Sequence, residues 1–238
     1  MLEREIIRST VVGVSPYPLL YAKVWGSHSH NTQLPESDVD YLGVYVAPTH
    51  EVLSIDKPAE TVTHNKPDIE AHEVEKFCRL LLKGNPSMVE MLFTDKMHYM
   101  TEPWVELVMC RQTFLSQSVV KQYLGYANGQ LMRLKKGTKL HTKGGEYNTK
   151  WAYHIIRVLG DAYEIAKGGA PVVWKEGPEH KLLMAIRHGE YEPERVVKMA
   201  GDMIGGIERV KPWALPVEGD RGRLNDWLLS IRMEESNA

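Results

Sequence analysis

A short apolar run, a glycine turn and two closely spaced aspartates constrain the fold of this chain more than any other feature. The run Leu19–Trp25 is largely apolar, which predicts a buried strand that ends at the turn Gly26-Ser27. Ten mostly polar residues follow, and a second strand is predicted over Val39–Val46. Because side chains alternate along an extended chain, Asp38 and Asp40 are expected to point to the same side.

The chemistry of these residues suits a phosphate and a divalent cation. Two carboxylates this close repel one another, and such a pair is usually kept because a cation lies between them; Mg²⁺ takes one or two protein carboxylates together with water and phosphate oxygens. Gly26 lets backbone N–H groups approach a phosphate closely, and Ser27 adds a hydroxyl donor. An isolated Ser-Asp-x-Asp segment is more often a solvated turn. The order of strand, turn, spacer and strand favours a site for a nucleoside triphosphate (NTP) with Mg²⁺ or Mn²⁺.

This arrangement resembles the polymerase-β-type nucleotidyltransferases, whose signature is Gly-Ser, a spacer of about this length and then D-x-D. The resemblance extends to a subgroup of predicted nucleotidyltransferases related to a polymerase-β-like protein that is associated with RNA ligase and RNA repair. It implies transfer of a nucleoside monophosphate from an NTP to an acceptor hydroxyl, with release of pyrophosphate. The residues that carry the subgroup resemblance span nearly the whole chain: Lys76–Leu80, Lys83–Pro86, Leu92-Phe93, Leu124–Tyr126 and Asn148–Lys150, with His154 and Arg157.

The superfamily also uses a third carboxylate on a neighbouring strand, as a base or as a ligand to a second metal. Asp68 and Glu70, within Thr61–His72, are the candidates. Asp68 fits the subgroup better, because an Asp lies at that offset before its Lys-Phe segment, and Glu70 is the second choice on the same strand face. Either acid has a simpler interpretation, as an exposed acid that protects an edge strand. The resemblance thus implies Asp38, Asp40 and Asp68 as metal ligands.

The predicted fold is of the α/β (α+β) class. Strands and helices alternate up to about residue 98, which predicts a mixed-sheet nucleotidyltransferase domain over residues 1–98. A helical bundle is predicted over residues 99–238, where apolar residues recur at helical spacing. The stripes of its helices include Val120, Tyr123, Leu124, Ala127 and Leu131, then Val196, Ala200, Met203 and Ile207, and finally Leu224, Trp227, Leu228 and Ile231.

Within the predicted bundle, Lys150, His154 and Arg157 fall at positions i, i+4 and i+7 and form one cationic stripe. An acid of the bundle would satisfy these charges. The resemblance instead implies that they bind the nucleotide, since helical domains of related folds supply basic residues to it. The basic segment Arg133–Gly145 has the same two interpretations, as a solvated loop or as a clamp for phosphates.

Composition limits the classes of protein to which the chain can belong. A formal net charge of −2 and a pI near 6.6 argue against a protein held on bulk nucleic acid by long-range charge. Cys78 and Cys110 lie in apolar, helix-like contexts, which predicts buried thiols in a reducing compartment. Neither a signal peptide nor an apolar run of the roughly 18 residues that a membrane span needs is seen. We therefore expect a soluble, cytoplasmic protein.

The sequence leaves the acceptor open. An RNA 3′ end is the preferred candidate, because the subgroup includes relatives in RNA repair. A small hydroxylated molecule or a protein side chain would use the same residues. A different class of function is a non-catalytic partner that senses nucleotides or neutralises a toxin, which the absence of a third carboxylate would favour. The fold alone does not decide among these functions.

Overall fold

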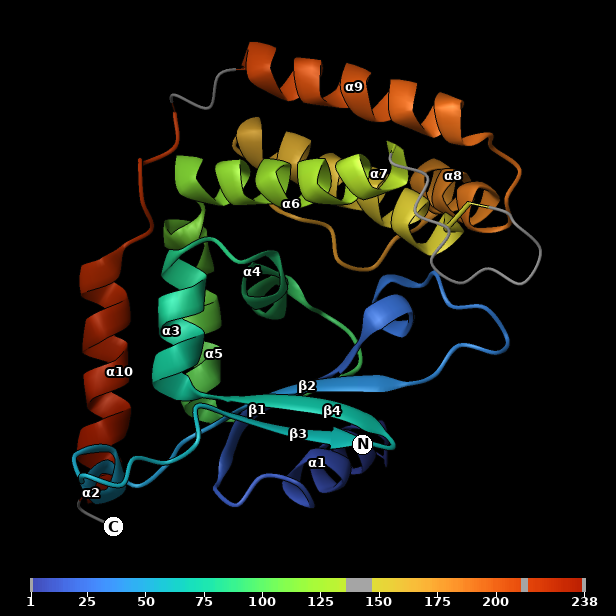
Figure 1. Cartoon of the computed structure of the whole chain (residues 1–238). Coiled ribbons are helices and arrows are strands. Elements are labelled where there is room, and N and C mark those ends of the chain that lie inside the picture. Colours follow the sequence, from blue (N-terminus) through green and yellow to red (C-terminus); the bar gives the residue numbers. More distant parts are fainter. Residues whose placement is uncertain (1, 136–146, 211–213, 237–238) are drawn as a thin grey trace. The chain divides into compact units, whose positions relative to one another are not determined.

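The computed structural model describes residues 2–135, 147–210 and 214–236, and the chain forms two compact units (Figure 1). The first unit comprises Met1–Leu82, Ser87–Phe114 and Asp220–Ala238, and the second comprises Lys83–Pro86 and Leu115–Gly219. This division differs from the expected one at residue 98. The helix α5 (Glu102–Met109) packs on the sheet, and the last helix, α10 (Arg221–Ser236), packs on helices of the first unit, so both belong to that unit.

A five-stranded mixed sheet is the centre of the first unit, which confirms the predicted α+β class. Its order is β3-β4-β2-β1-β5. Strand β2 pairs in parallel with β4 and antiparallel with β1, and the remaining pairs are antiparallel. The strands are β1 (Leu19–Trp25), β2 (Asp40–Tyr45), β3 (Thr61–Asn65), β4 (Asp68–Glu73) and β5 (His98–Met100).

Helices cover both faces of this sheet. On one face, Ile7 and Val11 of α1 (Leu2–Val12) pack with Ala22 and Ile69 in a buried cluster. On the other face, Tyr21 stacks on a tryptophan of α5, with ring centroids 4.3 Å apart. The helices α3 (Val74–Leu82), α4 (Pro86–Phe93) and α10 complete this side, and Phe77, Trp104 and Trp227 meet there ring to ring.

The described residues of the second unit form the helices α6 (Gln117–Lys135), α7 (Thr149–Ala166), α8 (Gly177–Arg187) and α9 (Pro193–Val210). Helix α7 packs against each of the other three. It begins at Asn148, whose side chain accepts a hydrogen bond from the Trp151 backbone N–H at 3.0 Å and so caps the first turn. In the part of the chain that the structure describes, no helix is long and apolar enough to cross a membrane.

Candidate functional site

Strand β1 runs directly into a short 3₁₀-helix, η1 (Gly26–His30), whose first two residues are the Gly26-Ser27 turn. Gly26 has φ = +67°, a backbone conformation that favours glycine. A Cβ added at Gly26 would lie only 2.7 Å from Oδ2 of Asp40, the first residue of β2. Trp25 and Asp40 are partners in the antiparallel ladder, which explains this close approach. The structure therefore brings the predicted turn and one predicted carboxylate together, and glycine keeps the space between them open.

The connection between the turn and β2 is folded by its own hydrogen bonds. The backbone N–H of Thr32 donates to the Ser27 carbonyl oxygen at 3.0 Å. The hydroxyl of Ser37 accepts from the Leu34 N–H at 2.9 Å, and the His28 ring nitrogen Nε2 lies 3.1 Å from the Ser37 carbonyl oxygen. These bonds fix the path of the chain from Ser27, which is half-buried, to the two aspartates.

Asp38 and Asp40 differ in their surroundings. Asp38 lies in the segment just before β2 and is exposed, whereas Asp40 is half-buried and starts the strand. The strand thus begins one residue later than predicted. Asp40 thus stands at the start of β2 beside the Gly26-Ser27 turn, and Asp38 lies two residues before it in the chain.

The two candidates for a third carboxylate lie on β4, which is the parallel neighbour of β2. The ladder of these strands starts with Tyr41 opposite Ile69, so Asp40 and Asp68, each one residue earlier, stand at the same end of adjacent strands. Asp68 and Glu70 are both exposed. The simpler interpretation of an edge-strand acid does not hold, because β4 lies between β3 and β2.

A chain of polar contacts ends at Glu70. Lys76 donates from Nζ to Oγ1 of Thr61, and this hydroxyl lies 3.1 Å from Nδ1 of His72. Nε2 of His72 lies 3.3 Å from Oε1 of Glu70, and a carboxylate only accepts, which favours the tautomer with the ring proton on Nε2; Nδ1 then accepts from the Thr61 hydroxyl. Burial, followed by the charge of Lys76, lowers the pKa of His72 to about 4, so the ring is neutral near pH 7. The neutral ring thus orients Glu70.

No pattern in the sequence had marked His72 for this role, since its partners Thr61 and Lys76 lie on different elements. Only the i, i+2 spacing of Glu70 and His72 on one strand face was available as a signal.

The donor set fits a hard divalent cation. Carboxylate oxygens are what Mg²⁺ prefers, and it commonly takes only one or two from the protein. Asp38 and Asp40 would supply these oxygens, and glycine at position 26 lets the Asp40 carboxylate lie close to the turn. Within the described ranges, no three His, Cys, Asp or Glu side chains are grouped closely enough to hold a metal ion by themselves. A cation here would therefore depend on water and phosphate oxygens for its remaining ligands.

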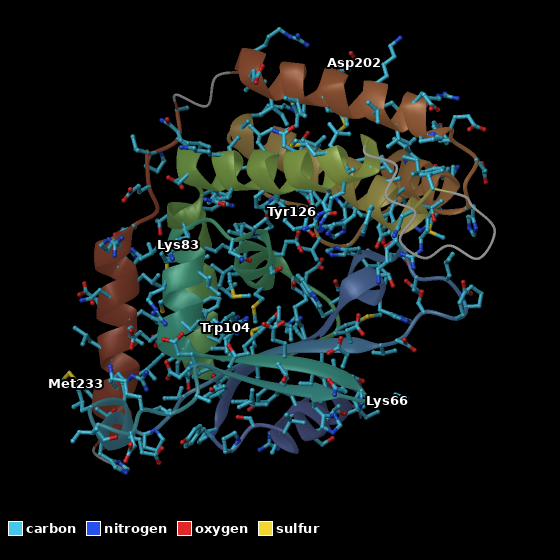
Figure 2. All side chains as sticks on the ribbon, viewed as in Figure 1. Lys66, Lys83, Trp104, Tyr126, Asp202 and Met233 are labelled. Carbon is cyan, nitrogen blue, oxygen red and sulfur yellow. The ribbon has the colours of Figure 1, made fainter. Side chains whose placement is uncertain are left out.

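The predicted cationic stripe of α7 lies in the second unit, and its three members differ. Lys150 is exposed. His154 has its ring nitrogen Nε2 3.0 Å from the hydroxyl of Tyr126 on α6, a residue labelled in Figure 2. Burial, then the charges of Arg157 and Lys150, lower the pKa of His154 to about 3. The stripe thus contains a neutral histidine held close to two cations.

Arg157 is 2% exposed and belongs to a buried ionic network. Its Nη1 lies 3.3 Å from Oδ2 of Asp161, and Oδ1 of Asp161 accepts from Nζ of Lys175 at 2.8 Å. Lys175 also donates to Glu179 on α8 at 2.8 Å. For Arg157, the alternative of an acid within the bundle is therefore the one observed. Residues 136–146, which make up most of the predicted basic segment, lie outside the described residues.

Comparison with known proteins gives a family match and two relatives. The chain matches the model of RlaP, described as an RNA repair pathway DNA polymerase beta family, over residues 4–195. The "Uncharacterized 38.9 kDa protein in nrdC-mobD intergenic region" of Enterobacteria phage T4 is 27% identical over 131 residues, which are 49% of this chain and 39% of that protein. The "Uncharacterized protein YcgL" of Bacillus subtilis (strain 168) is 25% identical over 156 residues, 63% of this chain and 57% of that protein. The aligned part thus spans about half the length of these relatives, and the predicted subgroup is confirmed.

Proposed function

The chain belongs to the RNA repair pathway DNA polymerase beta family, and we propose that it transfers a nucleoside monophosphate from an NTP to an acceptor hydroxyl, with release of pyrophosphate. The observation that carries this proposal is the approach of Gly26 to Asp40. A glycine with φ = +67° stands where any Cβ would lie 2.7 Å from the carboxylate. Glycine lets the Asp40 carboxylate lie this close to the turn, so that backbone N–H groups that would bind phosphate stand next to an acid that would bind the cation.

Each residue of the site has a role in this reaction. The backbone N–H groups of the turn and the Ser27 hydroxyl bind the β- and γ-phosphates. Asp38 and Asp40 would hold Mg²⁺ or Mn²⁺, which when bound neutralises charge on the phosphates as a Lewis acid. Asp68, or failing that Glu70, accepts the proton of the acceptor hydroxyl. The acceptor oxygen forms a bond to the α-phosphorus as the bond to pyrophosphate breaks on the opposite side.

The nucleotide-binding roles of Lys150, His154 and Arg157 rest on the family resemblance. Among the three, Lys150 is the exposed cation and Arg157 is held by Asp161. On that resemblance, Lys150 and Arg157 are proposed to neutralise charge on the leaving pyrophosphate.

An RNA 3′ end is the acceptor we favour, since the family is described by a role in RNA repair. A small hydroxylated molecule or a protein side chain would require the same chemistry. The second candidate function is a non-catalytic, antitoxin-like partner that senses nucleotides. It is favoured by one observation: in the described part of the chain, no third acid is grouped with Asp38 and Asp40.

Replacing Asp40 by Asn tests the proposal, because the amide keeps the shape of the side chain and removes its charge. The variant is expected to lose NTP-dependent transfer and to keep the melting temperature within about 2 °C, a shift that corresponds to about 0.5–1 kcal/mol. Asp56→Asn is the matched control, an exposed aspartate of the same unit that is expected to keep full activity. Full transfer by Asp40→Asn would refute the assignment of the carboxylate pair.

A further inference from the structure

A buried cluster of ionisable side chains lies at the end of the 3₁₀-helix that begins with the Gly26-Ser27 turn, and the reaction described above does not use it. Nε2 of His30, the last residue of η1, lies 3.6 Å from Oε2 of Glu90 on α4. The two side chains are 2% and 0% exposed. Because η1 begins at Gly26, this contact joins the far end of the turn segment to a helix of the same unit.

A buried lysine of β1 extends the cluster. Lys23 is fully buried and donates from Nζ to Oγ1 of Thr94 at 2.6 Å. The hydroxyl of Thr94 in turn donates to the Glu90 carbonyl oxygen at 2.7 Å. The ammonium group also lies 5.1 Å from the centre of the Trp25 ring, and that ring meets the His30 ring edge-on at 6.2 Å. Contacts therefore run from Lys23 through α4 to His30 and back to Trp25.

This closed set of contacts surrounds the residue that precedes the turn. Trp25 stands directly before Gly26 and opposite Asp40 in the ladder, so its position governs both. A second tie acts on the turn itself, since the Ser29 hydroxyl donates to the Gly26 carbonyl oxygen at 3.0 Å. This hydrogen bond fixes the direction of the Gly26 carbonyl group.

A gain in folding stability does not by itself explain why such a cluster is present. Removing charges from water costs several kcal/mol per ion, and replacing a buried ion pair by apolar residues of similar volume is often neutral or stabilising. Lys23, through Thr94, and the His30–Glu90 contact link β1, η1 and α4, and such links suit a different purpose, which is to hold the turn at the start of η1 in a single geometry.

We propose that Glu90 and His30 are positioning residues that hold the Gly26-Ser27 turn in the geometry that binds the NTP phosphates, without contacting the nucleotide. This inference rests on the proposed function, because it concerns the same turn. Charge and shape at Glu90 would then affect the binding of NTP more than the chemical step.

The test compares Glu90→Gln with Glu73→Gln. Glu73 is also a buried carboxylate of the first unit, 5% exposed, and its Oε1 accepts from Nη2 of Arg232 at 2.6 Å. Both changes weaken a buried contact between ionisable side chains, but only Glu90 contacts the segment that begins with the Gly26-Ser27 turn. The readouts are the melting temperature, the dissociation constant of each NTP with Mg²⁺ by calorimetry, and the KM and kcat of transfer.

Glu90→Gln is expected to raise the NTP dissociation constant and the KM about tenfold, as is typical when a supporting residue of a binding site is changed. Glu73→Gln is expected to lower the melting temperature and to leave the KM unchanged. A merely structural role for Glu90 predicts the same behaviour as Glu73, because a smaller folded fraction lowers the apparent kcat and not the KM. Equal KM values for the two variants would overturn the inference.

The pair is tested as a unit by His30→Gln and by the double variant. If Glu90 and His30 act together, the double variant shows about the same tenfold effect as either single variant. Independent effects that multiply to about a hundredfold would contradict the pairing. Should Glu90→Gln fail to fold, His30→Gln carries the same comparison. Failure of the wild-type protein to bind any NTP would instead refute the proposed function itself.

Discussion

Replacing Gly26 by Ala perturbs the proposed site at the place where the turn and the Asp40 carboxylate lie closest together. The change has two costs. The first is backbone strain, because Gly26 has φ = +67° and a non-glycine residue in this region costs about 1–2 kcal/mol. The second is steric: the new Cβ lies 2.7 Å from Oδ2 of Asp40, so the carboxylate must move by about 0.7 Å to reach the 3.4 Å at which ordinary contact begins.

These costs predict different effects on stability and on activity. The strain lowers the melting temperature by about 2–8 °C, at about 2–4 °C per kcal/mol. The displacement of Asp40 acts on the reaction, where a misplacement of about 1 Å can reduce the rate about a hundredfold. We therefore expect Gly26→Ala to fold and to transfer nucleotide about a hundred times more slowly.

Gly177→Ala is the matched control for the backbone strain. Gly177 has φ = +61°, and a Cβ at this position would meet nothing within 4 Å. The control is expected to lose a similar amount of stability and to keep its transfer rate. Melting curves and single-turnover rates of the two variants separate the effects. If Gly26→Ala transfers as fast as Gly177→Ala, the argument that glycine keeps the space beside Asp40 open is wrong.

Three further predictions follow from the same structure. Asp161→Ala leaves the buried Lys175 with one partner fewer and is expected to cost about 3–5 kcal/mol in urea unfolding; a loss under 1 kcal/mol would contradict this. The pKa of His154 is lowered from 6.5 to about 3, so the unfolded state binds the extra proton and the free energy of unfolding falls as the pH drops from about 6.5 towards 3. In His154→Gln, the free energy of unfolding should fall less between pH 7 and pH 5. An equal fall in the variant and the wild type would contradict the lowered pKa. In single-turnover assays, Asp68→Asn is expected to reduce transfer about a hundredfold or more and Glu70→Gln less, whereas the reverse ranking would assign the base to Glu70.

The local part of the fold could be predicted from the sequence. The apolar run before Gly26 and the D-x-D segment predicted β1 and, to within one residue at each end, β2, with a turn at Gly26-Ser27 between them, because strand alternation and glycine conformation are properties of neighbouring residues; that the turn opens a 3₁₀-helix was not predicted.

Long-range packing was less accessible. Trp227 looked like part of a C-terminal bundle, yet its ring packs with Phe77 and Trp104, and its Nε1 donates to the Pro103 carbonyl oxygen at 2.8 Å, which places α10 in the first unit. An amphipathic stripe shows that a helix buries one face, but it does not say against what.

The candidate site was likewise only partly predictable from the sequence. The order of strand, turn, spacer and strand predicted that Gly26 and Asp40 belong to one site, and the antiparallel pairing of the two strands that brings them together is a finding of the structure. It did not reveal the cluster of Lys23, His30 and Glu90, since charged residues at these positions look like surface residues until the neighbouring elements are known. The sequence did not decide the partner of Arg157 for a similar reason. An acid at position i+4 and an external phosphate can each neutralise the charge of a cationic stripe.

The central claim, nucleotidyl transfer, is tested most directly by following label from each of the four α-phosphate-labelled NTPs, with Mg²⁺ or Mn²⁺. The acceptors are total small RNA, a pool of hydroxylated small molecules and the protein itself, and the double variant Asp38→Ala/Asp40→Ala is the control. Our account predicts label on RNA that disappears with the double variant. Absence of label on every acceptor, while NTP still raises the melting temperature, would contradict catalysis and support a nucleotide-sensing protein.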